Sequence, residues 1–151
     1  MEYIVRQKFI SFFHQRFEVV DRDENLKYTI NSPSIFFKKH EITDFNGNLV
    51  GIVKKRYMRI LARNDVLNAD GKLQFIIKKK FTIFTKRFKV VDKTGAENKY
   101  TLNGDIFAWS FNLKRNDEIV AKYDKKVIAF TDTFYVNVLD DSVTLLAIGI
   151  A

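Results

Sequence analysis

The chain has 151 residues, 46% hydrophobic and 15% aromatic, which excludes a disordered segment and suffices for one domain with a substantial core. It has no Cys, which excludes disulfides, thiolate metal sites and cysteine nucleophiles. Its formal net charge is +8 at pH 7, and residues 54–93 alone carry thirteen Lys and Arg against three Asp, a local net charge of +10. This concentration indicates an anionic partner, while lysines that only solvate or protect strands are the alternative explanation.

The N-terminal residues show no targeting signal. Residues 1–6 (MEYIVR) lack the apolar stretch of a signal peptide. The longest weakly polar run, residues 143–151, is about half of the ~20 residues that a membrane-spanning helix needs. We therefore expect a cytoplasmic location, with peripheral association as the only contact with membranes.

Most of the chain is predicted to form short strands. Polar and apolar residues alternate around Phe17 and Val19, and again around Tyr28 and Ile30, which is typical of strands with one buried face. Turn signals recur about every ten residues. They include Asn46-Gly47, Asp70-Gly71, Asn103-Gly104 and Asn116-Asp117. Because such dipeptides supply the positive φ angles of tight hairpins, we predict an antiparallel barrel or sandwich.

The pattern of the first half recurs in the second. Residues 16–22 (RFEVVDR) match residues 87–93 (RFKVVDK), and the segment YTIN that starts at Tyr28 matches YTLN at Tyr100. A long unit present only twice differs from a solenoid, in which three or more units stack. The sequence therefore predicts two half-folds that close on each other in one domain. We place the repeats at approximately 3–60 and 74–131, within the single domain 1–151.

Chemical motifs are scarce. Residues 44–48 (DFNGN) superficially resemble a calcium loop, but Leu49 and Lys55 stand where that loop needs Gly and Glu, so a hairpin turn explains them better. His14 and His40 are the only histidines, and a single His on a strand is usually structural. No nucleotide-binding, serine-hydrolase or zinc-protease motif is present. We predict a protein that is not an enzyme and uses no metal or cofactor.

The C-terminal run breaks the strand pattern. Asp140, Asp141 and Ser142 suit a helix N-terminus, because they accept hydrogen bonds from its free N–H groups. The following residues are apolar on every side, and a helix of that kind must be surrounded. We predict a helix over approximately 142–151, ~15 Å long, inside a closed sheet. A buried final strand is the alternative.

Three segments carry a family resemblance: residues 79–88 (KKFTIFTKRF), residues 100–107 (YTLNGDIF), and residues 131–138 (TDTFYVNV) with the apolar run after them. They resemble the LURP-one-related family, most closely its short bacterial members of the YxjI type. The resemblance implies a tubby C-terminal-like fold, mainly β: a closed antiparallel β-barrel of about twelve strands, formed by two tandem half-repeats around one central hydrophobic C-terminal helix. Family members usually continue past the position of Ala151, so we expect any function of that tail to lie outside this sequence.

Basic residues are the remaining candidates for function. Two groups, one from Lys54 to Arg63 and one from Lys78 to Lys89, could neutralise clustered phosphates, since several converging cations are needed for this. Strand alternation allows about half of each run to share one face. The predicted anion- and lipid-binding residues are Lys54, Lys55, Arg56, Arg59, Lys78, Lys80, Lys86 and Arg87.

We therefore expect peripheral binding to anionic phospholipid, or to another phosphate-bearing ligand, through a basic surface. The resemblance adds that tubby-like domains bind phosphoinositides, an analogy of fold. The alternative is an intracellular adaptor or stress-response protein that binds a protein partner. Nucleic acid is expected to bind only non-specifically, because the exposed aromatic platform of single-strand binders is not recognisable.

Overall fold

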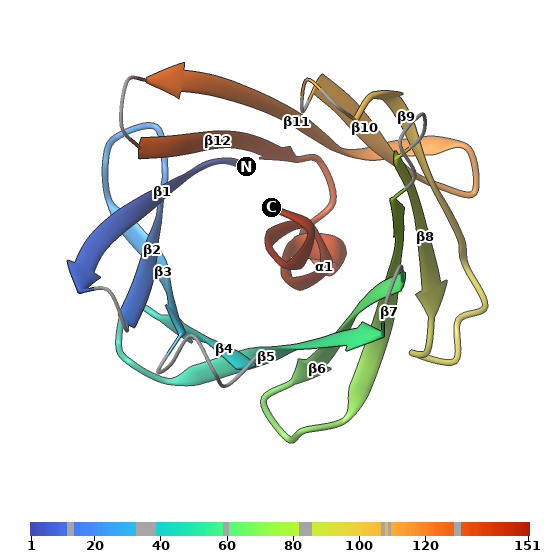
Figure 1. Ribbon diagram of the computed structural model, residues 1–151, viewed down its shortest axis with the longest axis horizontal. Helices are drawn as coiled ribbons and strands as arrows, with labels where there is room; N and C mark the ends of the chain where they lie inside the picture. The colour runs from blue at the N-terminus through green and yellow to red at the C-terminus, as the bar shows by residue number, and fades with distance from the viewer. Residues whose placement is uncertain are drawn as a thin grey trace.

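A computed structural model describes residues 1–11, 14–32, 39–58, 61–81, 86–106, 108, 110–128 and 131–151. In this part of the chain, twelve antiparallel strands form a closed barrel around one short helix (Figure 1). The strands are β1 (Glu2–Ser11), β2 (His14–Val20), β3 (Leu26–Ser32), β4 (Lys39–Asp44), β5 (Leu49–Met58), β6 (Leu61–Asn68), β7 (Leu73–Phe81), β8 (Lys86–Asp92), β9 (Lys99–Asp105), β10 (Ser110–Arg115), β11 (Glu118–Ile128) and β12 (Thr131–Val138). A 3₁₀ turn, η1 (Asp141–Val143), leads into the helix α1 (Thr144–Ile150).

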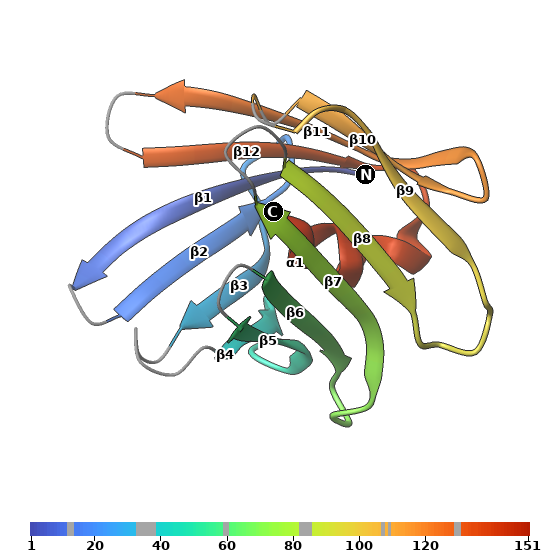
Figure 2. The ribbon, with the colours of Figure 1, turned by 45° about the vertical axis from the view of Figure 1, so that its right-hand side comes forward.

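Each strand pairs with its neighbours in sequence, and β1 pairs with β12 to close the ring. The closing register places Tyr3 opposite Val136. Figure 2 shows the N-terminus beside β12, where this closure occurs. The predicted closed antiparallel barrel is confirmed. Closure gives every strand a partner on both sides, although β8 and β9 pair only at Val90 with Tyr100 and at Val91 with Lys99.

Alternation along the strands builds the core. In β12, Phe134, Val136 and Val138 are buried inside the barrel, while Tyr135 and Asn137 between them are more exposed. Successive side chains point to opposite faces of a strand, so each strand contributes every second residue to the interior. The interior side chains of the strands meet those of α1 in one continuous cluster.

The hairpin interpretation of residues 44–48 agrees with the structure. The Asp44 carboxylate accepts backbone hydrogen bonds from Asn46 and Asn48, each 2.9 Å long. Gly47 has φ +85°, which glycine adopts without strain. The carboxylate therefore organises the turn between β4 and β5.

Asn103-Gly104 is not the turn that its sequence suggested, because both residues lie within β9. Gly104 has φ +131°, and a Cβ there would lie 2.7 Å from the Ser110 carbonyl oxygen and 2.8 Å from the Phe111 Cα. The glycine permits β9 and β10 to approach more closely than a side chain would allow.

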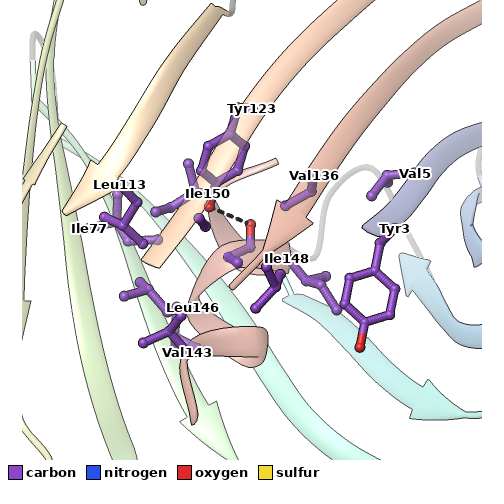
Figure 3. Packing of buried hydrophobic residues seen from close by; sticks show 14 of the residues in the cluster. Tyr3, Val5, Ile77, Leu113, Tyr123, Val136, Val143, Leu146, Ile148 and Ile150 are labelled. Atoms are coloured by element: carbon purple, nitrogen blue, oxygen red, sulfur yellow. Dashed lines mark hydrogen bonds between the residues drawn. The ribbon is translucent and has the colours of Figure 1, made fainter. Parts of the chain in front are cut away.

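The C-terminal helix is confirmed, and the alternative of a buried final strand is wrong. Asp140 caps the helical segment, since its carboxylate accepts the Ser142 N–H at 2.9 Å. Leu146 and Ala147 of α1 are fully buried. The buried Tyr123 hydroxyl donates a 3.0 Å hydrogen bond to the Ala147 carbonyl, and so ties β11 to the helix (Figure 3). The helix therefore lies inside the barrel and forms the centre of its core.

The two halves of the barrel use equivalent registers. His40 lies opposite Val53 between β4 and β5, as Phe111 lies opposite Tyr123 between β10 and β11. Further along the same strands, Lys55 pairs with Asn64, and Lys125 pairs with Phe134. These positions are related by offsets of 70 or 71 residues, close to the 71 and 72 residues that separate the repeated sequences. The structure thus allows the halves to be compared residue by residue.

Candidate anion-binding surface

Four basic residues lie side by side on the outer face of strands β5 to β8. The registers pair Arg56 with Arg63, Arg63 with Lys78, and Lys78 with Lys89. Neighbouring strands are ~4.8 Å apart, so this cationic row (Arg56, Arg63, Lys78 and Lys89) spans roughly 14 Å. Three of its members are exposed, and Arg63 is partly exposed. The row points away from the core, because the residues next to Lys78 and Lys89, Ile77 and Val90, face inward.

One carboxylate orients half of the row. Asp65 lies beside it on β6 and binds Arg56 Nε at 2.9 Å and Arg63 Nε at 2.5 Å. The Asp65 side chain is only 5% exposed, whereas that of Arg56 is 61% exposed. Asp65 therefore holds both guanidinium groups and leaves their remaining N–H donors free for solvent or a ligand. The row together with Asp65 has a net charge of +3.

Lys78 and Lys89 form the other half of the row. Within the described residues, neither has a carboxylate within ion-pair distance. Like charges directly opposite each other destabilise a sheet. Protection of a free strand edge does not explain Lys78, which is paired on both sides, with Arg63 and with Lys89. The arrangement favours an anion that would relieve the repulsion.

The predicted basic residues separate onto two faces of the sheet. Lys54, Arg56 and Lys78 are exposed on the outside. Lys55, between two of them, points into the barrel, where it is half-buried and lines a pocket that is partly open to solvent. Lys55 therefore does not belong to the basic surface to which the sequence analysis assigned it, because alternation sends it to the opposite face.

For four of the predicted anion-binding residues, the side-chain position lies outside what the structure describes. Arg59 lies outside the described residues, as do the side chains of Lys80, Lys86 and Arg87, whose backbones belong to β7 and β8. The row also contains two residues absent from the predicted set, Arg63 and Lys89. Arg63 could have been found, because Arg63 and Lys78 lie seven residues before and after the Asp70-Gly71 turn.

Inside the barrel, positive groups gather at the pocket that Lys55 lines. Burial lowers the pKa of Lys55. Burial, and then the charges of Lys55 and Lys79, lower the pKa of His40 to about 4, so its imidazole is neutral at pH 7. The sequence analysis treated His40 as structural. Its inward position could have been found from alternation with Ile42, which is almost fully buried.

Among the described residues, no three His, Asp or Glu side chains gather to hold a metal ion. In the same part of the chain, no helix has both the length and the apolar character needed to cross a membrane.

Comparison with known proteins places the chain in a family. A solved structure from Arabidopsis thaliana, the protein AT5G01750, is similar with a TM-score of 0.60 and 14% identity, over 99% of this chain and 88% of that one. At this identity the likeness concerns the fold alone. No curated protein matches the chain. The family model described as LURP-one-related matches residues 1–151. The chain therefore belongs to the LURP-one-related family.

Proposed function

We propose that this protein binds anionic phospholipid at a membrane surface, through the cationic row and the neighbouring Lys54, and that it catalyses no reaction. The observation that carries the proposal is the register of β5 to β8, which aligns Arg56, Arg63, Lys78 and Lys89 on one outer face. Their shared chemistry is recognition of phosphate.

The length and the expected electrostatic energy of the cationic row support a membrane surface, rather than a single free phosphate, as its ligand. Each Lys or Arg near an anionic leaflet contributes about 1 kcal/mol. The row is roughly 14 Å long, wider than a single headgroup, so its cations meet several lipids at once. At ~0.1 M salt the screening length is about 10 Å, so neighbouring cations of the row act together, and high salt weakens them. Asp65 also holds the two guanidinium groups in place, which reduces the entropy lost on binding.

The test is co-flotation with vesicles of phosphatidylcholine alone and of phosphatidylcholine with phosphatidylserine, at about 50 and 300 mM salt. The decisive variant is Lys78→Glu with Lys89→Glu. The matched control is Lys99→Glu with Lys122→Glu, which makes the same change in net charge at exposed positions of β9 and β11. Inorganic phosphate is added as a competitor in a separate arm.

The proposal predicts binding to anionic vesicles only, lost at high salt. The Lys78/Lys89 variant should bind at least 30-fold more weakly, which corresponds to about 2 kcal/mol for two lysines. The control variant should lose much less, and millimolar phosphate should not compete. Equal losses in both variants would show that net charge acts without a site. Competition by phosphate would indicate a soluble phosphate ligand, and no binding to any vesicle would redirect attention to a protein partner.

A further inference from the structure

Asp and Glu gather at one end of the barrel, where the even-numbered strands end and the odd-numbered strands begin. This end, which we call the acidic rim, consists of residues 1–2, 20–26, 44–49, 68–73, 92–99, 115–118 and 138–142. Figure 2 shows the turn between β8 and β9 at this end and the arrow tips of β1 and β11 at the other. The acidic rim carries twelve Asp and Glu against five Lys and Arg, a net charge of −7.

The chemistry of the turns explains why acids gather there. The carboxylates of Asp21, Asp44 and Asp92 each accept a hydrogen bond from the backbone N–H two residues later, at 2.9, 2.9 and 2.8 Å. Arg6 and Lys27, just outside the acidic rim, form ion pairs with two of its carboxylates and reduce the local net charge to −5. The acids therefore have a local structural cause, but the end of the barrel stays negative.

The barrel beyond the acidic rim is basic. The described side chains outside the rim include fifteen Lys and Arg against five Asp and Glu. The cationic row is well separated from the rim. Lys78 lies five residues from Leu73, where its strand leaves the rim, and this is ~17 Å of extended chain. Because the screening length at 0.1 M salt is only about 10 Å, the row and the rim act as separate charges of opposite sign.

Further cations extend the basic surface around the barrel. Lys39, the first residue of β4, lies opposite Lys54, and Lys8 of β1 lies opposite Arg16 of β2. The side chain of Lys8 is 53% exposed and that of Arg16 is 38% exposed. Together with the cationic row these are eight cations, and they keep a net charge of +5 after the carboxylates that pair with them are counted. These carboxylates are Glu18, Glu41 and Asp65.

This separation of charge favours one orientation at an anionic surface. With the barrel on its side and the cationic row flat on the bilayer, the rim ends of β6, β7 and β8 would also meet the headgroups. Those ends carry Asp70 and Asp92, which lipid phosphates repel. With the barrel standing on the end opposite the rim, the cations approach the headgroups and the rim lies beyond the screening length. The upright orientation therefore keeps the attraction and avoids the repulsion.

We propose that the acidic rim orients the protein, so that the barrel stands on an anionic membrane with the rim towards water and the opposite end towards the bilayer. This inference rests on the proposed function, because it concerns the same membrane surface. It adds Lys8, Arg16 and Lys39 to the residues that face the lipid headgroups.

The experiment attaches one fluorescent label at a time, which is possible because the chain has no Cys. Gln15→Cys and Ala108→Cys probe the end opposite the rim, Ala69→Cys and Ala96→Cys probe the rim, and all four positions are exposed. Each labelled protein is bound at about 50 mM salt to vesicles of phosphatidylcholine and phosphatidylserine that contain a lipid with a nitroxide on its headgroup. Labels at positions 15 and 108 should lose most of their fluorescence, whereas labels at 69 and 96 should keep most of it.

Ala69 distinguishes the two orientations, because it lies in the turn between β6 and β7, two strands of the cationic row. Quenching at Ala69 would overturn the upright orientation and leave membrane binding intact. Equal quenching at all four positions would overturn it as well, since no orientation would be preferred. If the unlabelled protein does not bind these vesicles, the proposed function and the orientation both fail.

Two charge variants test the same point without a label. Asp70→Lys adds two positive charges at the rim and should change binding to anionic vesicles less than about two-fold, because the rim lies beyond the screening length. Gln15→Lys adds one charge at the opposite end and should strengthen binding about five-fold. A larger gain from Asp70→Lys than from Gln15→Lys would overturn the proposal.

Discussion

Strands β5 and β11 occupy equivalent places in the two halves of the barrel, but their inner faces differ. In β11, Tyr123 stacks on Phe111 at 4.5 Å and reaches the helix with its hydroxyl group. In β5, the equivalent pair is Val53 and His40, and a pocket lies beside them. We call β1–β6 the hollow half and β7–β12 the filled half. Aromatic rings in one half thus anchor the helix, while smaller side chains in the other leave a pocket beside it.

The inner lysines differ in the same way. Lys125 of the filled half lies over the Phe134 ring at 5.1 Å. Lys55, its equivalent in the hollow half, pairs instead with Asn64. On the outer face, Lys54 is exposed where β11 has Asp124. The two copies therefore share one scaffold but present different side chains at equivalent positions of their inner and outer faces.

The largest expected effect comes from removing one aromatic ring from the core-facing side of each half. Phe111→Ala in the filled half should lower the free energy of unfolding by about 3–5 kcal/mol, because Phe111 is 3% exposed and packs on Tyr123. Phe17→Ala in the hollow half should lower it less, since Phe17 is only partly buried and borders the existing pocket. Urea unfolding followed by circular dichroism measures both. Equal losses would contradict the distinction between the halves.

A smaller effect should appear on acidification. The pKa of His40 in the folded protein is about 4, below its ordinary value of 6.5, so the unfolded chain binds more protons between these values. This part of the stability is complete above pH 6.5 and is lost as the pH falls towards 4, by about 3 kcal/mol.

His40→Phe introduces into the hollow half the Phe ring that the filled half has at the equivalent position, Phe111. The variant also lacks the titration of His40. The free energy of unfolding of the variant should therefore fall less between pH 6.5 and 4 than that of the unaltered protein. The comparison uses the difference between the two proteins in unfolding free energy at each pH, because carboxylates such as Asp44 also titrate near the acidic end in both. Parallel curves would show that His40 is not buried as a neutral group.

The smallest expected effect on stability comes from removing the Tyr123 hydroxyl group, which has no counterpart at the equivalent residue, Val53. Tyr123→Phe removes the hydrogen bond to the Ala147 carbonyl and should lower the free energy of unfolding by about 1 kcal/mol. The loss stays small because that carbonyl also accepts the Ala151 N–H within the helix. A loss above about 3 kcal/mol in urea unfolding would contradict this, since it would mean that the carbonyl is left unsatisfied.

Much of the fold could be predicted from the sequence, because its signals are local or repeated. The duplication, the dipeptides at the turns and the apolar C-terminal run led to a closed barrel around a helix. The turn predicted at Asn103-Gly104 was wrong, because Gly104 is needed where β9 passes close to Ser110 of β10 and leaves no space for a side chain. A dipeptide pattern does not contain that distance.

The candidate sites were less predictable for two physical reasons. Residues 82–85, between β7 and β8, contain no Gly or Pro to mark a turn, so the pairing of Lys78 with Lys89 could not be counted from the sequence. In β5, both Ile52 and Val53 are apolar, so alternation shows that Lys54 and Lys55 are on opposite faces but not which one is inside. The pocket depends on side-chain volumes across five strands, which no local pattern encodes.

The central claim is that the outer face of β5 contributes to membrane binding and its inner face does not, and Lys54→Met and Lys55→Met test it most directly. The two substitutions affect adjacent residues and change the net charge equally. In co-flotation with anionic vesicles at low salt, Lys54→Met should bind about five-fold more weakly, which corresponds to ~1 kcal/mol for one lysine. Lys55→Met should bind like the unaltered protein. Equal loss in both variants, or loss only in Lys55→Met, would contradict the assignment of the membrane surface to the outer face.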